Sequence, residues 1–364
     1  MSGASPRPTP RHPPTSDAHP VAPDPLRLPY GDGMRLAAVV AVIGVHASGI
    51  AVARYGHLDA WRWWSANAID SLCRWAVPVF IMLSGALLLD PARREPTGAF
   101  YRKRVTRVGI PLLAWASFYF YWTSAFYGEP VDRAFVVHAL LDGLTYNHLY
   151  FLFLILGLSA ATPALRTYVR RVSRSWQWLV AALALAAASL GIPQNAIPMN
   201  AATRFAPFLG YFLAGFLLRD VPLTTSLGAA AFVVLVGSTT IVAVGTGQRF
   251  AAWGPDDARS LALYDTLGAP VVAQAVAMFL LLRACFTPRA GGRASDLTRR
   301  MAPLAFGIYL VHRAVLDVIA SAAGSVLPEA ALSTIAVHIA ATFVIAAAVV
   351  AVIRRVPYVR RIVG

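Results

Sequence analysis

The chain has 364 residues, of which 57% are hydrophobic and only 13% are charged. A soluble chain usually carries about 25% charged residues, so the composition excludes an ordinary soluble domain. The formal net charge of +15 would suggest a nucleic-acid partner in a soluble protein. Here, however, the basic residues cluster between long apolar runs, as topology signals do in membrane proteins. We therefore predict an all-α, multi-pass membrane protein that is surrounded by lipids and binds no nucleic acid.

The segment 1–29 contains nine prolines and no apolar core, which excludes a signal peptide or a transit helix. Its composition predicts a disordered cytoplasmic tail in which His12 and His19 are solvated. We expect the membrane domain to occupy residues 30–355 and a cytoplasmic C-terminal tail to occupy residues 356–364.

A membrane-spanning helix needs about twenty mostly apolar residues. The sequence predicts about ten such segments, at residues 34–53, 71–90, 108–127, 147–165, 176–192, 204–218, 223–245, 264–284, 303–323 and 331–353. With both termini in the cytoplasm, twenty-three of the Lys and Arg residues fall on the cytoplasmic side, five on the outer side and four within segments. This asymmetry follows the positive-inside rule and supports a ten-helix bundle with both ends inside.

The first segment carries two ionisable residues, Arg35 and His46, eleven positions apart. Eleven residues turn an α-helix to within about 20° of its starting direction and advance it by about 16 Å, so both side chains share one face. Arg35 is then expected at the cytoplasmic border, and His46 near the middle of a hydrocarbon layer about 30 Å thick.

Two interpretations of this pair compete. In the structural one, His46 hydrogen-bonds a neighbouring helix and Arg35 contacts lipid phosphates. In the functional one, His46 transfers a proton and Arg35 holds an anion, because imidazole titrates near neutrality and guanidinium binds phosphate. Ionisable groups at mid-depth are usually functional, so we favour group transfer from a phosphorylated cytosolic donor. This pattern alone does not identify the group.

Six motifs in order resemble the acyltransferase-3 family of integral membrane O-acyltransferases. The match runs from residue 30 to about residue 355. The motifs are "YGDGMRLAAVVAVIGVH", "PVFIMLSGALLL", "YRKRVTRVGIPLLAW", "NHLYFLFLILGLSAATP", "RFAPFLGYFLAGFLLR" and "GIYLVHRAVL".

The resemblance implies a ten-helix core in a bacterial inner membrane that takes an acyl group, expected to be acetyl, from cytosolic acyl-CoA. The acceptor would be a hydroxyl of a glycan or lipid-linked sugar at the outer face. His46 would be catalytic, Arg35 would help to handle the donor, and Arg104 and Arg107 would bind CoA. Without the resemblance, that arginine cluster would be assigned to topology and lipid headgroups.

Two further histidines are candidate substrate residues. His148 starts the fourth segment near the outer face, where it fits either an aromatic belt at headgroup depth or an acceptor site. His312 lies mid-depth in the ninth segment and is the chief rival of His46 for the catalytic role. His338 is predicted at similar depth in the tenth segment.

Two ion pairs are predicted from an i,i+4 spacing, Asp70 with Arg74 and Arg313 with Asp317. We interpret both as mainly architectural, because pairing neutralises charge inside a bilayer, although Arg74 is also a candidate substrate residue. Ser84 lacks the flanking pattern of a nucleophile elbow, and we expect Gly85 beside it to allow close helix packing.

The two cysteines, Cys73 and Cys285, have no metal-ligand spacing, so the sequence predicts neither a disulfide framework nor a metal site. The main alternative function is a transporter or flippase in which His46 and His312 line a proton or substrate path. Such proteins often show related repeats and paired helix interruptions, and we find no convincing example in this sequence.

Overall fold

The computed structural model describes residues 28–93, 95–287, 293–323 and 332–364, and the regular structure of these residues is helical throughout. Most of the predicted tail 1–29, with His12 and His19, lies outside the described residues. The α-helices are α1 (Gly31–Val52), α2 (Ala60–Cys73), α3 (Ala76–Leu88), α4 (Thr97–Arg104), α5 (Ile110–Tyr127), α6 (Arg133–Asp142), α7 (Tyr150–Arg171), α8 (Arg174–Ser189), α9 (Ile192–Ala196), α10 (Leu209–Leu218), α11 (Thr225–Trp253), α12 (Ala269–Phe286), α13 (Arg293–Met301), α14 (Ala305–Ala323) and α15 (Leu332–Ile353). Short π or 3-10 turns are η1 (Val105–Gly109), η2 (Ala206–Phe208), η3 (Ala258–Tyr264), η4 (Ala302–Leu304) and η5 (Val359–Val363).

Each of the ten predicted segments coincides with at least one helix. Within the described ranges, seven helical stretches are long and apolar enough to cross a membrane: Gly31–Val52, Ala60–Leu88, Tyr150–Arg171, Thr225–Trp253, Ala258–Phe286, Asp296–Ala322 and Leu332–Ile353. The helices α8 and α10 are shorter than the roughly twenty residues a span needs, and α5 carries Tyr, Trp and Ser among its apolar residues. The chain is therefore a multi-pass helical protein with seven candidate spans, while the count of ten stays a prediction.

The second candidate span is broken between α2 and α3. Pro78 lies four residues after Arg74, and a proline ring clashes with the carbonyl four positions earlier. The α-helix accordingly stops at Cys73 and restarts at Ala76. This break places Arg74 at a helix end inside the molecule, beside the site described below.

The helices α3 and α10 approach each other closely at two glycines. A Cβ atom added to Gly85 would lie 1.8 Å from the backbone oxygen of Phe212, and one added to Gly215 would lie 1.9 Å from that of Met82. Only glycine allows two backbones to approach so closely. The predicted packing role of Gly85 is confirmed.

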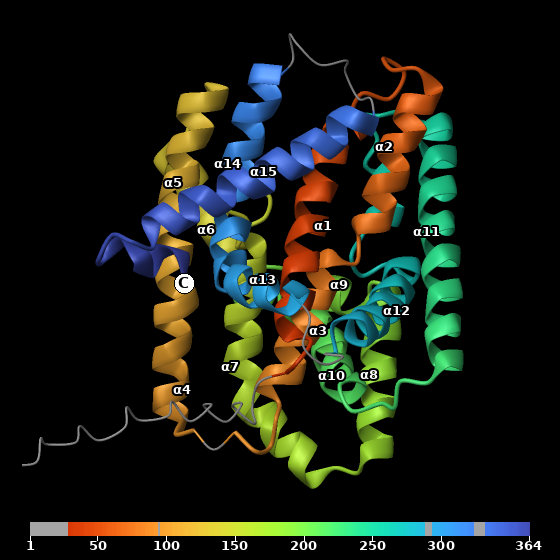
Figure 1. The fold of residues 1–364 in the computed structure, drawn as a ribbon, viewed down its shortest axis with the longest axis vertical. Helices are drawn as coiled ribbons and strands as arrows, with labels where there is room; N and C mark the ends of the chain where they lie inside the picture. The colour runs from red at the N-terminus through yellow and green to blue at the C-terminus, as the bar shows by residue number, and fades with distance from the viewer. Residues whose placement is uncertain (1–27, 94, 288–292, 324–331) are drawn as a thin grey trace, which may run out of the picture.

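Several helices, among them α1, α5, α7, α8 and α11, run roughly along the long axis of the molecule, whereas α15 crosses this direction obliquely (Figure 1). The connection between α1 and α2 lies at the top in this view, whereas α4 and the connection between α7 and α8 lie at the bottom. The predicted C-terminal tail includes the ordered turn η5, which packs against α5. The indole Nε1 of Trp115 donates a hydrogen bond of 2.9 Å to the carbonyl of Ile362, and Val363 is fully buried.

Candidate functional site

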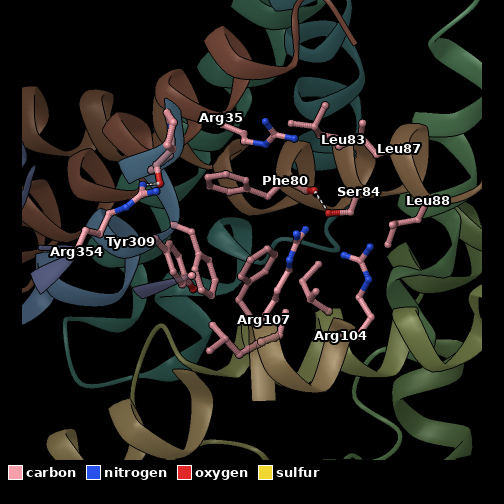
Figure 2. Close-up of a pocket in the computed structure, with 18 residues that line it drawn as sticks. Arg35, Phe80, Leu83, Ser84, Leu87, Leu88, Arg104, Arg107, Tyr309 and Arg354 are labelled. Atoms are coloured by element: carbon pink, nitrogen blue, oxygen red, sulfur yellow. Dashed lines mark hydrogen bonds between the residues drawn. The ribbon is translucent and has the colours of Figure 1, made fainter. Parts of the chain in front are cut away.

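A cavity of about 600 Å³, here called the donor cavity, lies between α1, α3, η1, α7 and α14. Four arginines line it: Arg35 from α1, Arg104 and Arg107 from the α4–η1 region, and Arg354 after α15. Figure 2 shows Arg104 and Arg107 pointing toward Ser84 from one side and Arg35 lying on the other. The structure thus brings together the three arginines that the sequence singled out.

Apolar and aromatic side chains form the rest of the donor cavity. Phe80, Phe151 and Tyr309 lie together, with ring centroids 5.3 to 6.2 Å apart. Ser84 also lines the cavity, but its hydroxyl donates to the carbonyl of Phe80 at 2.8 Å. A cavity with an apolar wall and several cations fits a long ligand that carries both phosphates and an apolar arm.

A second, smaller cavity of about 190 Å³, here called the histidine cavity, contains His46. It is also lined by Arg74, His148, Tyr150 and Tyr309. Tyr309 borders both cavities. The cavity with the arginines and the cavity with His46 therefore share this residue in their linings.

Three imidazoles cluster at the histidine cavity. The ring centroids of His46 and His312 are 5.2 Å apart, those of His148 and His312 are 4.8 Å apart, and those of His46 and His148 are 6.4 Å apart. His148 and His312 are buried, whereas His46 is half-buried and lines the cavity. Among the residues that the structure describes, no group of His, Cys, Asp or Glu is arranged to hold a metal ion.

Backbone carbonyls orient two of these rings. His312 Nδ1 lies 2.5 Å from the carbonyl oxygen of Tyr309, and His148 Nε2 lies 3.3 Å from that of Leu310. A carbonyl only accepts, so each of these nitrogens must carry the hydrogen. In the neutral rings the lone pairs are then on His312 Nε2 and His148 Nδ1, and neither atom has a hydrogen-bond partner in the described part of the chain.

Both predicted ion pairs are present. Arg74 pairs with the buried Asp70, and Arg313 Nε lies 2.9 Å from Asp317 Oδ1. Arg74 also lies over the ring of Tyr264, at 3.8 Å from its centroid, and lines the histidine cavity. The predicted pairing is confirmed, its architectural role stays a prediction, and its position in the cavity of His46 also suits a substrate contact.

The structure shows the surroundings of two predicted residues. His148, predicted either in an aromatic belt or at an acceptor site, is only 2% exposed, because Tyr119, Tyr146, Tyr309 and the other two imidazoles surround it. Its role at an acceptor site stays a prediction. Arg35 and His46, predicted to share one helix face, line different cavities, and Tyr309 from α14 lines both of these cavities.

Sequence reasoning missed Tyr309 and Arg354 as site residues. Tyr309 precedes His312 by three positions, which places both on one face of α14, and this spacing could have identified it. Arg354 belongs to a basic run after the last segment and looked like one more topology signal. Nothing local in the sequence indicates that the chain end folds back, so that Gly364 also lines the donor cavity.

A comparison with known proteins shows the family of the chain. The family model described as an acyltransferase domain, acyltransferase-3, matches residues 28–354, nearly the whole chain. Searches of curated proteins and of solved structures gave no match. The matched range includes α1, both cavities' helices and all three clustered histidines, and on that match the chain belongs to the acyltransferase-3 family.

Proposed function

We propose that this protein is a membrane O-acyltransferase that moves an acyl group from acyl-CoA to an acceptor hydroxyl. The observation that carries the proposal is the pair of cavities that meet at Tyr309, one lined by four arginines and the other by His46. The family match supports acyl transfer. The donor and the acceptor are inferred from the chemistry of the two cavities and from the resemblance.

The donor cavity suits acyl-CoA. Arginine binds phosphate through two parallel hydrogen bonds, and Arg35, Arg104 and Arg107 converge on one space (Figure 2). Arg35 keeps an ion pair with Asp32 at 2.8 Å, which holds its guanidinium near the cavity. The aromatic wall would contact the pantetheine arm and direct the thioester toward Tyr309.

In the proposed reaction, His46 removes the proton from the acceptor hydroxyl as its oxygen attacks the thioester carbonyl. The carbon–sulfur bond breaks, and the leaving thiolate takes a proton from the imidazolium, which gives the ester and free CoA. A covalent variant, in which His46 first accepts the acyl group, uses the same residue. His312, with its Nε2 lone pair buried nearby, is placed to orient His46 or to share the proton.

The acceptor is expected to be a glycan or lipid-linked sugar that reaches the histidine cavity from the other side of the membrane. Arg74, Tyr150 and His148 would contact its polar groups. We expect acetyl as the acyl group and a bacterial inner membrane as the location. Mass spectrometry of surface glycans from cells with and without the protein would reveal a lost ester and identify the acceptor.

Substitution of His46 tests the proposal directly. We expect His46→Ala to lower acyl transfer by about 10²–10⁴-fold, the usual contribution of a general base. We expect His312→Gln to lower it less, because a positioning residue does not itself take the proton. Release of CoA and ester formation are measured in membranes that contain equal amounts of each protein.

His138→Ala is the matched control, because His138 is an exposed histidine on α6 outside both cavities. It should retain wild-type activity. Full activity of His46→Ala would overturn the proposal, and a loss confined to His312→Gln would transfer the catalytic role to that residue.

A further inference from the structure

A third cavity of about 780 Å³ lies beside the donor cavity, between the chain that follows α3, the start of α4 and the end of α7. Its charged lining consists of Arg93, Glu95, Arg166 and Arg170, and its floor includes Phe100. None of these residues is used by the proposed reaction. The volume is in the range of small-molecule binding sites.

Positive charge is in excess in the third cavity. Three guanidinium groups face one carboxylate, and that carboxylate, Glu95, pairs with Lys103. The hydrogen bond from Lys103 lowers the pKa of Glu95, so Glu95 stays ionised and engaged with a cation from outside the cavity lining. The excess of positive charge in the cavity lining favours an anionic ligand.

Arg166 brings a buried guanidinium group to the third cavity. It is only 7% exposed, and its Nε donates a 2.7 Å hydrogen bond to the carbonyl of Leu88. Its Nη2 is buried and has no hydrogen-bond partner among the described residues. An unsatisfied buried donor on a charged group is costly, and a bound anion would satisfy it.

The surroundings of Phe100 also favour a bound anion. The guanidinium carbons of Arg104 and Arg166 lie 5.1 and 5.0 Å from the centroid of this one buried ring. Two like charges near one ring repel each other, and a bound anion beside them would reduce this repulsion. In addition, the first turn of α4 begins at Thr97 in the cavity and has no side-chain cap, and uncapped N–H groups at a helix start attract anions.

The third cavity adjoins the donor cavity through shared contacts. Leu88, whose carbonyl holds Arg166, lines the donor cavity, as does Arg104, whose guanidinium lies over Phe100. A ligand long enough to reach both cavities needs negative charge at two separate points. Acyl-CoA has this property, because its 3′-phosphate lies on the ribose, farther from the thioester than the pyrophosphate.

We propose that the third cavity binds the 3′-phosphate of the acyl-CoA donor, with Arg166 and Arg93 as its main contacts. The inference rests on the proposed function for the identity of the donor. The same phosphate chemistry could come from a lipid headgroup, so the test must separate these two sources.

The first experiment measures binding to the purified full-length protein by calorimetry. We expect adenosine 3′,5′-bisphosphate to bind more tightly than adenosine 5′-monophosphate, on the order of ten- to a hundredfold, the worth of one or two hydrogen bonds to a charged group. Arg166→Gln should remove this difference. Arg93→Gln, on a different segment, should reduce it and serves as a second variant if Arg166→Gln does not fold.

Arg171→Gln is the matched control, because it removes the same charge from an exposed position of α7 outside the cavity. It should keep the wild-type preference. Equal binding of the two nucleotides by the wild-type protein would overturn the inference. An unchanged nucleotide preference in Arg166→Gln would also overturn it. If that variant in addition retains less phosphatidylglycerol than the wild-type protein in native mass spectrometry, the cavity binds a lipid headgroup instead.

The second experiment compares acetyl-CoA with acetyl-dephospho-CoA as donors. We expect the wild-type KM to be lower for acetyl-CoA and the two KM values to converge in Arg166→Gln, with kcat little changed. Equal KM values for both donors in the wild-type protein would overturn this inference while acyl transfer from CoA still stands. Transfer from neither donor would instead overturn the proposed function, and the nucleotide titration would then decide on the site alone.

Discussion

Tyr309 lines both cavities of the proposed reaction. Its ring packs against Phe80 and Phe151 on the donor side, at 6.2 and 5.3 Å between centroids. Its hydroxyl donates to the carbonyl of His148 on the other side. The ring therefore borders both cavities, and in the proposed reaction the thioester would pass it to reach His46.

Replacing Tyr309 should change the choice of donor. Tyr309→Ala opens the partition, so we expect longer acyl groups such as butyryl to be transferred better relative to acetyl, and water to hydrolyse more acyl-CoA without acceptor. Tyr309→Phe keeps the ring and removes one buried hydrogen bond, which costs about 1 kcal/mol of stability, so its acyl preference should stay that of the wild type. Rates with acetyl-CoA and butyryl-CoA, with and without acceptor, check both variants. An unchanged preference in Tyr309→Ala would show that the ring does not limit the acyl group.

Single residues also show where sequence reasoning reaches its limit. The spacing of Arg35 and His46 gave their shared helix face, because helix geometry is local. It could not show that a residue of α14, more than 250 positions away in the sequence, would line both the cavity of Arg35 and the cavity of His46. The burial of His148 escaped for the same reason, since the rings that cover it come from α1, α5, α14 and the chain before α7.

Among the helices, α3 and α10 have the contact least tolerant of change. A side chain at Gly85 would meet backbone atoms of α10, which cannot rotate away. Overpacking usually costs about 1–3 kcal/mol and sometimes more, and we expect Gly85→Leu to be at or above the upper end. The midpoint of thermal unfolding in detergent should fall, with loss of folded protein on size-exclusion chromatography.

Gly237→Ala on α11 is the matched control for Gly85→Leu. A Cβ atom at Gly237 meets nothing within 4 Å, and alanine favours a helix by up to about 1 kcal/mol over glycine. This variant should be as stable as the wild type or more so. A stable Gly85→Leu protein would mean that α3 and α10 can separate without loss of the fold.

Helices were predictable from the sequence because backbone polar groups in lipid must be satisfied within the segment, which makes long apolar runs helical. Their ends were less predictable. The second segment was expected to begin at residue 71, yet α2 begins at Ala60, because polar residues such as Asn67 lower its hydropathy. Asn67 is buried and bonded to the carbonyl of Ala243 at 2.8 Å and to the hydroxyl of Tyr264 at 2.6 Å, partners that a linear pattern does not show.

For the whole molecule, the number of helices that cross the membrane decides on which side each connection lies. The helix α5 starts beside α4 at one end and runs toward the other end alongside its neighbours (Figure 1), although it is not among the seven candidate spans. If α5 crosses, Gly98 and Glu129, which lie before and after it, are on opposite sides. The distribution of positive charge puts Gly98 inside and His57, between α1 and α2, outside.

Labelling of single cysteines tests this topology. In a variant with Cys73→Ala and Cys285→Ala, we expect His57→Cys and Glu129→Cys to react with a membrane-impermeant maleimide in intact cells. Gly98→Cys should react only after the cells are permeabilised, and its position tolerates a side chain because a Cβ atom there meets nothing within 4 Å. Labelling of residues 98 and 129 from the same side would exclude α5 as a span. An odd number of the ten predicted spans would then remain, and the two termini would lie on opposite sides of the membrane. Labelling of residue 98 alone in intact cells would mean that the protein has the opposite orientation in the membrane. The donor cavity, which Arg104 and Arg107 line, would then face away from cytosolic acyl-CoA.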